Sequence, residues 1–341
     1  MFSFTNDYSE GAHPRILQAL ADTNLEQTCG YGLDHHCQEA AELIRQRCCA
    51  PNADVHFAVG GTQANLLVIH AMLRSFEAVI ATSTGHINVH ETGAIETTGH
   101  KVCTVPSPDG KMTPEMIRLV AEAHSSEHMV APRMVYISNT TEVGTFYTKA
   151  ELTALRRCCD ELGLYLYLDG ARLASALTAP GSDLTLADIA ALTDAFYIGG
   201  TKNGALFGEA IVLMNDAIKP YFRWYIKQRG AMLAKGFLFG VQFKALLQDE
   251  LYFDLARHAN GLAARMKEGL LAKGYTFPVE SFTNQLFPIM PNSVIRQLAD
   301  MGYGFEVDHR VDEDHTCIRF VTSWATPESA VEKFLEVLPQ A

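Results

Sequence analysis

Lys202 stands alone in the stretch YIGGTKNGALFGEAIV, residues 197–212, which begins and ends as an apolar strand pattern. The pattern breaks at Gly199 and Gly200, so the lysine falls on a glycine-flanked loop between two segments typical of buried strands. Apolar surroundings remove water from an ammonium group and thereby favour its neutral form. The stretch therefore indicates a lysine that acts as an amine nucleophile or forms a Schiff base.

A second candidate lies in AVGGTQAN, residues 58–65, where a strand pattern ends at Gly60 and Gly61 and a helix pattern starts at Thr62. Backbone amides at a helix N-terminus, with no side chains in the way, form an anion site that suits a phosphate. The threonine adds a hydroxyl. The stretch matches neither the nucleotide P-loop nor the dinucleotide fingerprint, and a tight turn without a ligand is the alternative interpretation.

The third candidate is Asp169, which ends the strand pattern LYLYLD at residues 164–169. A carboxylate at the end of a buried strand is costly unless it is paired. One suitable partner is a protonated ring nitrogen, as in pyridoxal phosphate, where an acidic residue keeps the electron sink charged. An ion pair with Arg172, three residues on, is the structural alternative. The glycine pair, the acid and Lys202 follow one another in this order along the chain.

Alternating strand and helix patterns place these three candidates. Helix signals are clear at Thr113, which caps a helix opened by Pro114, and at Thr148 and Glu151, which form a capping box. Strand patterns occupy residues 55–59, 78–82, 101–105, 134–138, 164–169 and 195–200. This alternation predicts a mainly parallel sheet with helices on both faces. Ligands bind beyond the carboxyl ends of such strands, which is where all three candidates fall.

The pattern changes after about Lys219. A long helical stretch is predicted over residues 223–248, and a further helix follows over 255–274. Short strands such as NQLFPIM and CIRFVT come next, with helices between them. We therefore expect an α/β protein with a large domain over residues 1–245 and a smaller α+β domain over residues 246–341.

Composition limits the partners. The chain of 341 residues has a net charge of −12 and no long Lys/Arg run, so neither nucleic acid nor an anionic membrane surface is an expected partner. The N-terminal stretch lacks signal-peptide features, and no apolar run is long enough to span a bilayer. None of the eight cysteines forms a CxxC pair, which favours buried thiols in a reducing compartment. We expect a cytoplasmic protein.

Stretches along nearly the whole chain resemble one family, the threonine aldolases and β-eliminating lyases. In order, they are NDYSEGAHPRIL, YGLD, GGTQAN, GHINVHETGA, SNTTEVGT, YLDGARL, GGTKNGALFGEA and IRFVTSWAT. The resemblance implies fold type I of the pyridoxal-phosphate (PLP) dependent transferases, as in aspartate aminotransferase. This fold has a mainly parallel seven-stranded sheet between helices and a smaller C-terminal domain. The resemblance also implies homodimers or homotetramers with shared active sites.

The resemblance further implies roles for individual residues. Lys202 would hold PLP as a Schiff base, Asp169 would pair with the pyridine nitrogen, and His86 would stack on the ring. Other cofactor contacts would come from Gly60, Gly61, Thr62, Arg172 and Thr201. The carboxylate of an amino-acid substrate would be bound by Arg319, with Arg172 and Asn6, and Tyr31 would lie near the active site, reaching in from a neighbouring subunit. The basic stretch FRWYIKQR is expected to be a subunit contact or a wall of the cofactor site.

The implied activity is cleavage of the Cα–Cβ bond of a β-hydroxy amino acid, giving glycine and acetaldehyde from L-threonine or L-allo-threonine, with low substrate specificity. A base must take the proton of the β-hydroxyl, and His86 or an ordered water is the candidate. The stretches GGTKNG and NTTEVG depart from the pattern of many threonine aldolases. A PLP-dependent β-eliminating lyase, an aminotransferase and a non-catalytic cofactor-binding protein stay as alternatives.

Two histidine-rich stretches could bind a metal. GHINVHE places His86, His90 and Glu91 close together, but the order HxxxHE matches no zinc-enzyme motif. No third ligand to join the two histidines is apparent. LDHHCQE resembles the DHH signature of metal phosphoesterases, with Asp34, His35 and His36, but the companion acidic motifs are absent. A helix cap at the aspartate explains this stretch without a metal. No metal site is expected.

Overall fold

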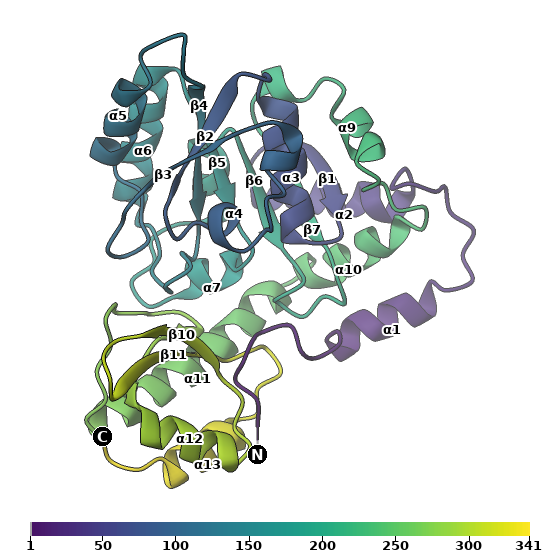
Figure 1. The fold of residues 1–341 in the computed structure, drawn as a ribbon. Helices are drawn as coiled ribbons and strands as arrows, with labels where there is room; N and C mark the ends of the chain where they lie inside the picture. Colours follow the sequence, from purple (N-terminus) through teal and green to yellow (C-terminus); the bar gives the residue numbers. More distant parts are fainter. Residues whose placement is uncertain (1) are drawn as a thin grey trace.

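The computed structural model describes residues 2–341, and a seven-stranded sheet forms the centre of its larger part (Figure 1). The strand order is β1-β7-β6-β5-β4-β2-β3, and only β7 runs antiparallel to its neighbours. The strands are β1 Asp54–Ala58, β2 Glu77–Thr82, β3 Val102–Val105, β4 Ala131–Ser138, β5 Tyr165–Asp169, β6 Ala195–Gly199 and β7 Glu209–Leu213. The mainly parallel sheet predicted from the sequence is thereby confirmed.

Each face of the sheet is covered by helices because successive strand residues point to opposite faces. On β4, Val135 and Ile137 belong to one buried cluster, and Met134 and Tyr136 belong to another. The first cluster includes residues of α1 Pro14–Asp22, α2 His35–Arg47, α5 Pro114–Ala123, α6 Lys149–Leu162, α8 Leu186–Leu192 and α10 Phe237–Leu247. The second includes residues of α3 Gly61–Met72 and α9 Phe222–Gln228.

Local sequence signals set the helix ends. The side chain of Thr113 caps α5, and Pro114 is its first residue. Thr148 and Glu151 form both halves of a capping box at α6, and Gly163 ends that helix at a φ of 65°. A positive φ favours glycine because it has no Cβ to clash with the backbone. These predicted boundaries are confirmed.

The long helix predicted over residues 223–248 is wrong. The chain forms α9, leaves the helix at Arg229 and Gly230, and starts α10 only at Phe237. The φ of Gly230 is 68°, a left-handed conformation that ends a helix. The apolar pattern ran across this break because the connecting residues Ala231 and Met232 pack against the same cluster as α9.

A smaller part follows the long helix α11, Leu251–Ala272, and lies below the seven-stranded sheet in Figure 1. Its antiparallel strands have the order β10-β11-β8, with β9 also paired to β11. The elements are β8 Gln285–Leu286, β9 Ile289–Pro291, α12 Asn292–Asp300, β10 Glu306–Arg310, β11 His315–Val321 and α13 Glu328–Val337. None of the helices in residues 2–341 is both long and apolar enough to cross a membrane.

The N-terminal segment packs against this smaller part. Phe4 belongs to a third buried cluster, together with Phe320 of β11 and Phe334 of α13. The amide of Val321 donates to the carbonyl of Phe4 over 2.7 Å. The segment then leads to Asp7, close to the sheet, so it links the two parts of the molecule. The division at residues 245 and 246 stays a prediction.

Candidate active site

Loops at the carboxyl ends of the strands enclose a cavity of about 210 Å³. Asp169 is the last residue of β5, and Lys202 lies three residues beyond β6. The predicted site residues that line the cavity are Gly60, Gly61, Thr62, His86, Asp169, Thr201 and Lys202. The other lining residues are Tyr8, Glu142, Ala171, Tyr197 and Glu209. The structure therefore brings the three candidates of the sequence together.

Asp169 is held as an anion by hydrogen-bond donors. Tyr136 donates to Oδ2 over 2.6 Å, Asn65 donates to Oδ2 over 2.9 Å, and the Ala171 amide donates to Oδ1 over 3.0 Å. Tyr197 also donates to Oδ1. Burial acts to raise the pKa of Asp169, but His86 and the tyrosine hydroxyls outweigh it and hold the pKa below 3.8. A buried carboxylate is thus fixed facing the cavity.

The two tyrosines have fixed roles as donors. Burial, followed by the charge of Asp169, raises the pKa of Tyr136 and of Tyr197 well above 10. Both hydroxyls therefore keep their protons and donate to the carboxylate. Tyr136 lies on β4 and Tyr197 on β6, which flank the strand that carries Asp169.

Lys202 is partly buried beside this carboxylate. Among residues 2–341, no side chain forms a hydrogen bond or ion pair with Nζ, which lies 5.9 Å from the centre of the Tyr8 ring. Burial, followed by the guanidinium of Arg172, lowers the pKa of Lys202 below 10.5. The nearby carboxylates of Asp7, Glu142 and Asp169 oppose this shift. The amine is therefore easier to deprotonate than an exposed lysine.

The start of α3 forms the anion cradle. Gly60 is the N-cap and offers no side-chain hydrogen bond, so the first amides of the helix stay open to a ligand. A Cβ on Gly61 would lie 2.8 Å from the Tyr197 hydroxyl, which holds Asp169. Glycine at 61 therefore lets the cradle approach the carboxylate closely.

Arg229 adds positive charge to this cradle. A second cavity of about 560 Å³ is lined by Arg229 together with Gly60, Gly61 and Thr62. One Nη of the arginine lies 3.1 Å from a ring nitrogen of His70, and its buried Nε has no partner within residues 2–341. An anion bound at the cradle would meet this guanidinium.

His86 opens the short helix α4, His86–Val89, and is oriented by a buried acid. Its Nδ1 lies 2.8 Å from Oε1 of Glu91, an oxygen that also accepts from Asn65 over 2.7 Å. Burial alone would lower the pKa of His86. Three carboxylates outweigh that effect and raise the pKa above 6.5, namely those of Glu91, Glu142 and Asp169. The hydrogen bond at Nδ1 sets the tautomer, so Nε2 is the atom that can exchange a proton.

The alternative ion pair between Arg172 and Asp169 is wrong. Arg172 instead pairs with Asp7, Nε donating to Oδ2 over 2.7 Å and Nη2 donating to Oδ1 over 3.0 Å. Lys202 lines a small cavity beside this pair. The fork of the guanidinium matches a carboxylate in two parallel bonds, and the carboxylate of Asp169 already has four donors.

The remaining predicted residues lie outside this cavity. Arg319 pairs with Glu306, its Nη2 lies 3.4 Å from the Thr5 carbonyl, and its buried Nε has no partner within residues 2–341. The side chain of Asn6 accepts from the amide of Tyr8 over 3.0 Å and so caps its own turn. Tyr31 is 45% exposed and lines a different pocket. Their predicted roles in substrate binding stay predictions.

Several residues of the site have no signal in the sequence. Tyr136, Tyr167 and Tyr197 follow the apolar alternation of buried strands, so they read as core. Burial raises the pKa of the Glu209 carboxyl, on β7, to about 8, and this group faces the same cavity. Arg229 belongs to FRWYIKQR, and it lines the cavity at the start of α3. Whether this stretch is a subunit contact or a wall of the cofactor site stays a prediction.

The fold and the site define an α/β protein in which a lysine, a buried acid and a helix N-terminus meet at one cavity. A family model described as Beta-eliminating lyase matches residues 7–292, and the chain belongs to this family. The predicted resemblance is thereby confirmed.

Relatives and solved structures agree with this assignment. Low-specificity L-threonine aldolases of Pseudomonas aeruginosa and of another Pseudomonas species are each 33% identical to the chain. The alignments cover 95% and 97% of this chain and 93% and 95% of those proteins. A structure of Leishmania major threonine aldolase is 54% identical, with a TM-score of 0.98, covering 99% of this chain and 98% of that chain.

A more distant structure shows the fold alone. Aspartate aminotransferase of Thermus thermophilus is 18% identical, with a TM-score of 0.73, covering 98% of this chain and 90% of that chain. The fold class predicted from the sequence, that of aspartate aminotransferase, is confirmed.

Proposed function

We propose that this chain is a PLP-dependent aldolase that cleaves L-threonine and L-allo-threonine to glycine and acetaldehyde with low substrate specificity. The observation that carries the proposal is the convergence of Lys202, Asp169 and the cradle at Gly60 and Gly61 on one cavity. The relatives that cover nearly the whole chain are described as aldolases, which supports this activity over β-elimination or amino transfer.

The residues of the cavity fit PLP. The cofactor carries an aldehyde, a basic ring nitrogen and a phosphate, and the cavity offers an amine, an anionic carboxylate and open helix amides. When bound, it would supply an electron sink for the bond-breaking step. Lys202 would hold the aldehyde, Asp169 the ring nitrogen, and Gly60, Gly61, Thr62 and Arg229 the phosphate.

Lys202 supplies an amine that loses its proton readily. The lowered pKa increases the neutral fraction, which is the nucleophilic form. Asp169 is kept anionic by its four donors, so it can hold a proton on a basic ring nitrogen. Asp169 ends β5 and Lys202 lies three residues beyond β6, so neighbouring parallel strands bring both groups to the same edge of the sheet.

His86 is the proposed base for the β-hydroxyl of the substrate. Glu91 accepts from Nδ1, so in the neutral ring Nε2 carries the free lone pair that can take a proton. Glu142 lines the same cavity and adds negative charge that stabilises the resulting imidazolium. The proton can then leave through Nε2 to solvent or to the product.

Arg319 is the proposed residue for the substrate carboxylate. Its unpartnered Nε retains a donor, and its Glu306 partner is half exposed, so the guanidinium can exchange partners. Thr5 contacts the same guanidinium, which places Asn6 beside it along the chain. Arg172 already forms an ion pair with Asp7. We therefore propose that Arg172 positions the N-terminal segment next to Lys202.

We also propose a cytoplasmic homodimer or homotetramer with shared active sites. Tyr31, Leu33, Tyr221 and Trp224 are large side chains that the single chain leaves exposed. A neighbouring subunit that covered them would bring Tyr31 toward its own cavity or toward that of the partner. Sedimentation equilibrium of the purified protein gives the oligomeric state.

An absorption spectrum of the purified protein, followed by product analysis, tests the proposed function. We expect a visible absorbance band from a PLP that is bound to the lysine as an imine. Threonine, allo-threonine and phenylserine should each release glycine and an aldehyde. A keto acid with ammonia would indicate β-elimination, and a requirement for an amino acceptor would indicate amino transfer. A colourless protein that releases no aldehyde would contradict the proposal.

A further inference from the structure

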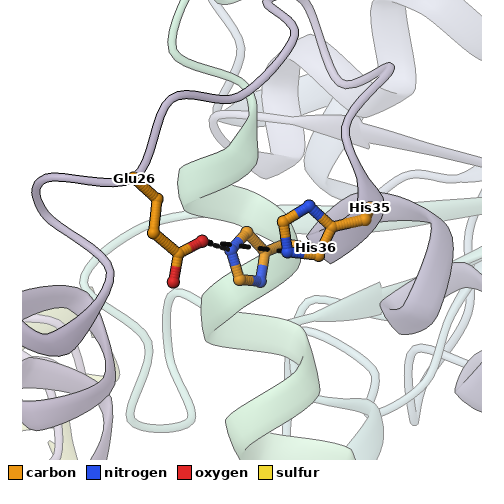
Figure 2. A group of neighbouring side chains, drawn as sticks. All are labelled: Glu26, His35 and His36. Atoms are coloured by element: carbon orange, nitrogen blue, oxygen red, sulfur yellow. Dashed lines mark hydrogen bonds and ion pairs between the residues drawn. The ribbon is translucent and has the colours of Figure 1, made fainter.

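Three metal-ligating side chains that do not line the Lys202 cavity lie close together. Glu26 comes from the loop between α1 and α2, and His35 and His36 are the first residues of α2 (Figure 2). Oε2 of Glu26 lies 2.7 Å from Nε2 of His36 and 3.8 Å from Nε2 of His35. All three ligand atoms lie within 4.8 Å of one another. Each side chain thus presents a donor atom to one point.

The start of α2 is held firmly. Oδ1 of Asp34 accepts from the Cys37 amide over 2.9 Å and caps the helix. Helix α10 packs against the backbone of His36 and Cys37 at Gly240, where any Cβ would collide with that backbone. The two histidines are therefore presented by a backbone fixed on both sides, and a preorganised pair of ligands binds a metal more tightly than a mobile pair.

We propose that Glu26, His35 and His36 form a binding site for a divalent transition-metal ion of the Zn²⁺ type. Zn²⁺ bonds imidazole nitrogen and carboxylate oxygen at about 2.0–2.2 Å, so neighbouring ligand atoms lie about 3.3 Å apart in a tetrahedral site. The two separations, 2.7 and 3.8 Å, bracket this value, so small side-chain rotations would bring the ligands into position.

The ligand types define the class of ion. Imidazole nitrogen suits late transition metals, whereas Mg²⁺ and Ca²⁺ prefer oxygen ligands alone. Three protein ligands leave one position of a tetrahedral ion for water. The ring of His36 is 8% exposed, and the side chains of Glu26 and His35 are 42% and 58% exposed, so an ion can enter from solvent.

A bound ion would restrain a loop. Glu26 and His35 lie on either side of the segment that carries Cys29 and Tyr31. A metal ion bound to both would cross-link the two ends of this segment. Closing a loop in the folded state raises stability, since the ion binds the folded chain more tightly than the unfolded one. None of the three ligands lines the Lys202 cavity, so we assign the ion a structural role.

This site was not expected from the sequence. The DHH stretch lacks the acidic motifs of metal phosphoesterases, and Glu26 lies outside this stretch in the sequence. The ligand set found here uses both histidines but leaves Asp34 as a helix cap. It is therefore distinct from a phosphoesterase centre.

A comparable group elsewhere serves as a contrast. Asp308, His309 and Cys317 also lie close together. Burial raises the pKa of the Cys317 thiol to about 12, and its sulfur donates to the Phe287 carbonyl, so the thiolate that a metal needs is disfavoured. His309 is consequently a suitable control position.

Metal titration of the untagged, cofactor-loaded protein tests the site. We expect calorimetry to show one Zn²⁺ or Ni²⁺ bound per chain, no binding of Mg²⁺, and a rise in Tm with Zn²⁺. His35→Gln and Glu26→Gln should each weaken Zn²⁺ binding at least about tenfold, since even outer-shell changes at metal sites cost that much. Both positions are exposed, so these variants should fold even if His36→Gln does not.

Two control variants decide the ligand set. Cys29→Ser and His309→Gln should bind Zn²⁺ as the unchanged protein does. Binding that survives in the His35→Gln and Glu26→Gln variants, or that disappears in Cys29→Ser, would overturn the proposed ligands. Absence of stoichiometric Zn²⁺ binding in the unchanged protein would overturn the site altogether, leaving only a hydrogen bond between Glu26 and His36.

Discussion

The guanidinium of Arg172 grips the carboxylate of Asp7 through two parallel hydrogen bonds, of 2.7 and 3.0 Å, next to Lys202. Asn284 donates to the same carboxylate over 2.9 Å. The pair joins the N-terminal segment to the start of α7, Leu173–Thr178, and both side chains are shielded from water. The charge of Arg172 beside Lys202 is thus already neutralised by a carboxylate of the same chain, which fixes this wall of the small cavity.

Removal of Asp7 should destabilise the fold strongly. Asp7→Ala leaves the buried charge of Arg172 unpaired, and such a loss costs about 3–5 kcal/mol in the free energy of unfolding. Urea denaturation measures this difference. Arg15→Ala is a matched control, because it breaks an exposed pair with Asp249 whose loss should cost less than about 1 kcal/mol. Equal losses in the two variants would contradict the structural role of the buried pair.

The carboxylate of Asp7 should make the free energy of unfolding depend on pH in the acidic range. Burial acts to raise the pKa of Asp7, but Arg172 and Lys202 outweigh it and hold the pKa below 3.8. A carboxylate with a lowered pKa contributes fully above pH 3.8, and this contribution is lost as the pH falls through the lowered value. The free energy of unfolding should therefore decline less steeply below pH 3.8 in Asp7→Asn than in the unchanged protein. Identical declines would show that Asp7 is not anionic in the fold.

His86 should control the pH dependence of turnover. A base must be neutral to accept a proton, and the pKa of His86 is raised above 6.5, so kcat/KM should increase as the pH rises through that pKa. The Glu91 carboxylate helps to hold the proton on the ring. Glu91→Gln should therefore lower the pKa of His86 and move the acidic limb of the profile to lower pH.

Aldehyde release measured across the pH range gives the kcat/KM profiles of the unchanged protein and of Glu91→Gln. Glu96→Gln serves as the control, since this acid lies on the same segment but does not line the cavity. An acidic limb that does not move in Glu91→Gln would assign the titration to another group.

Lys202 should be required for turnover and for an imine that borohydride can trap. Lys202→Ala removes the only lysine that lines the cavity within residues 2–341, so both signals should fall below detection. Mass spectrometry of the reduced protein locates the cofactor adduct. Lys235→Ala, an exposed lysine, is the control and should keep both signals. Full activity in Lys202→Ala would overturn the site.

The sequence predicts a site residue well where that residue follows a strand or precedes a helix. Asp169 and Lys202 lie after apolar strands, and Gly60 precedes a helix, so topology alone brings them to one edge of the sheet. The partner of Arg172 could not be predicted, because Asp7 comes from a segment 165 residues away. Asp169 was the predicted partner because it lies three residues before Arg172 in the sequence. In the structure, packing of the N-terminal segment brings Asp7 to Arg172 instead.

The two tyrosines that donate to Asp169 could not be predicted from the sequence either, for a physical reason. Tyr136 and Tyr197 occupy inward positions of buried strands, and a tyrosine there satisfies the apolar pattern whether or not its hydroxyl has a partner. Only the lateral order β4-β5-β6 shows that both hydroxyls reach Asp169. The break between α9 and α10 was missed for a similar reason, since apolar residues continue through the connecting loop.

Arg229 should contribute to cofactor affinity through the phosphate alone. Its guanidinium lines the cavity at Gly60, Gly61 and Thr62, and a hydrogen bond to a charged group contributes about 1.5–3 kcal/mol, or about a tenfold to hundredfold change in affinity. Arg229→Ala should weaken PLP binding to the apoenzyme by that factor, measured by fluorescence titration. Pyridoxal, which has no phosphate, should bind both proteins equally. Lys227→Ala changes a cation of α9 that does not line this cavity, and it should leave both affinities unchanged. A parallel loss of pyridoxal affinity would mean that the arginine acts by supporting the fold around His70 instead of by contacting the phosphate.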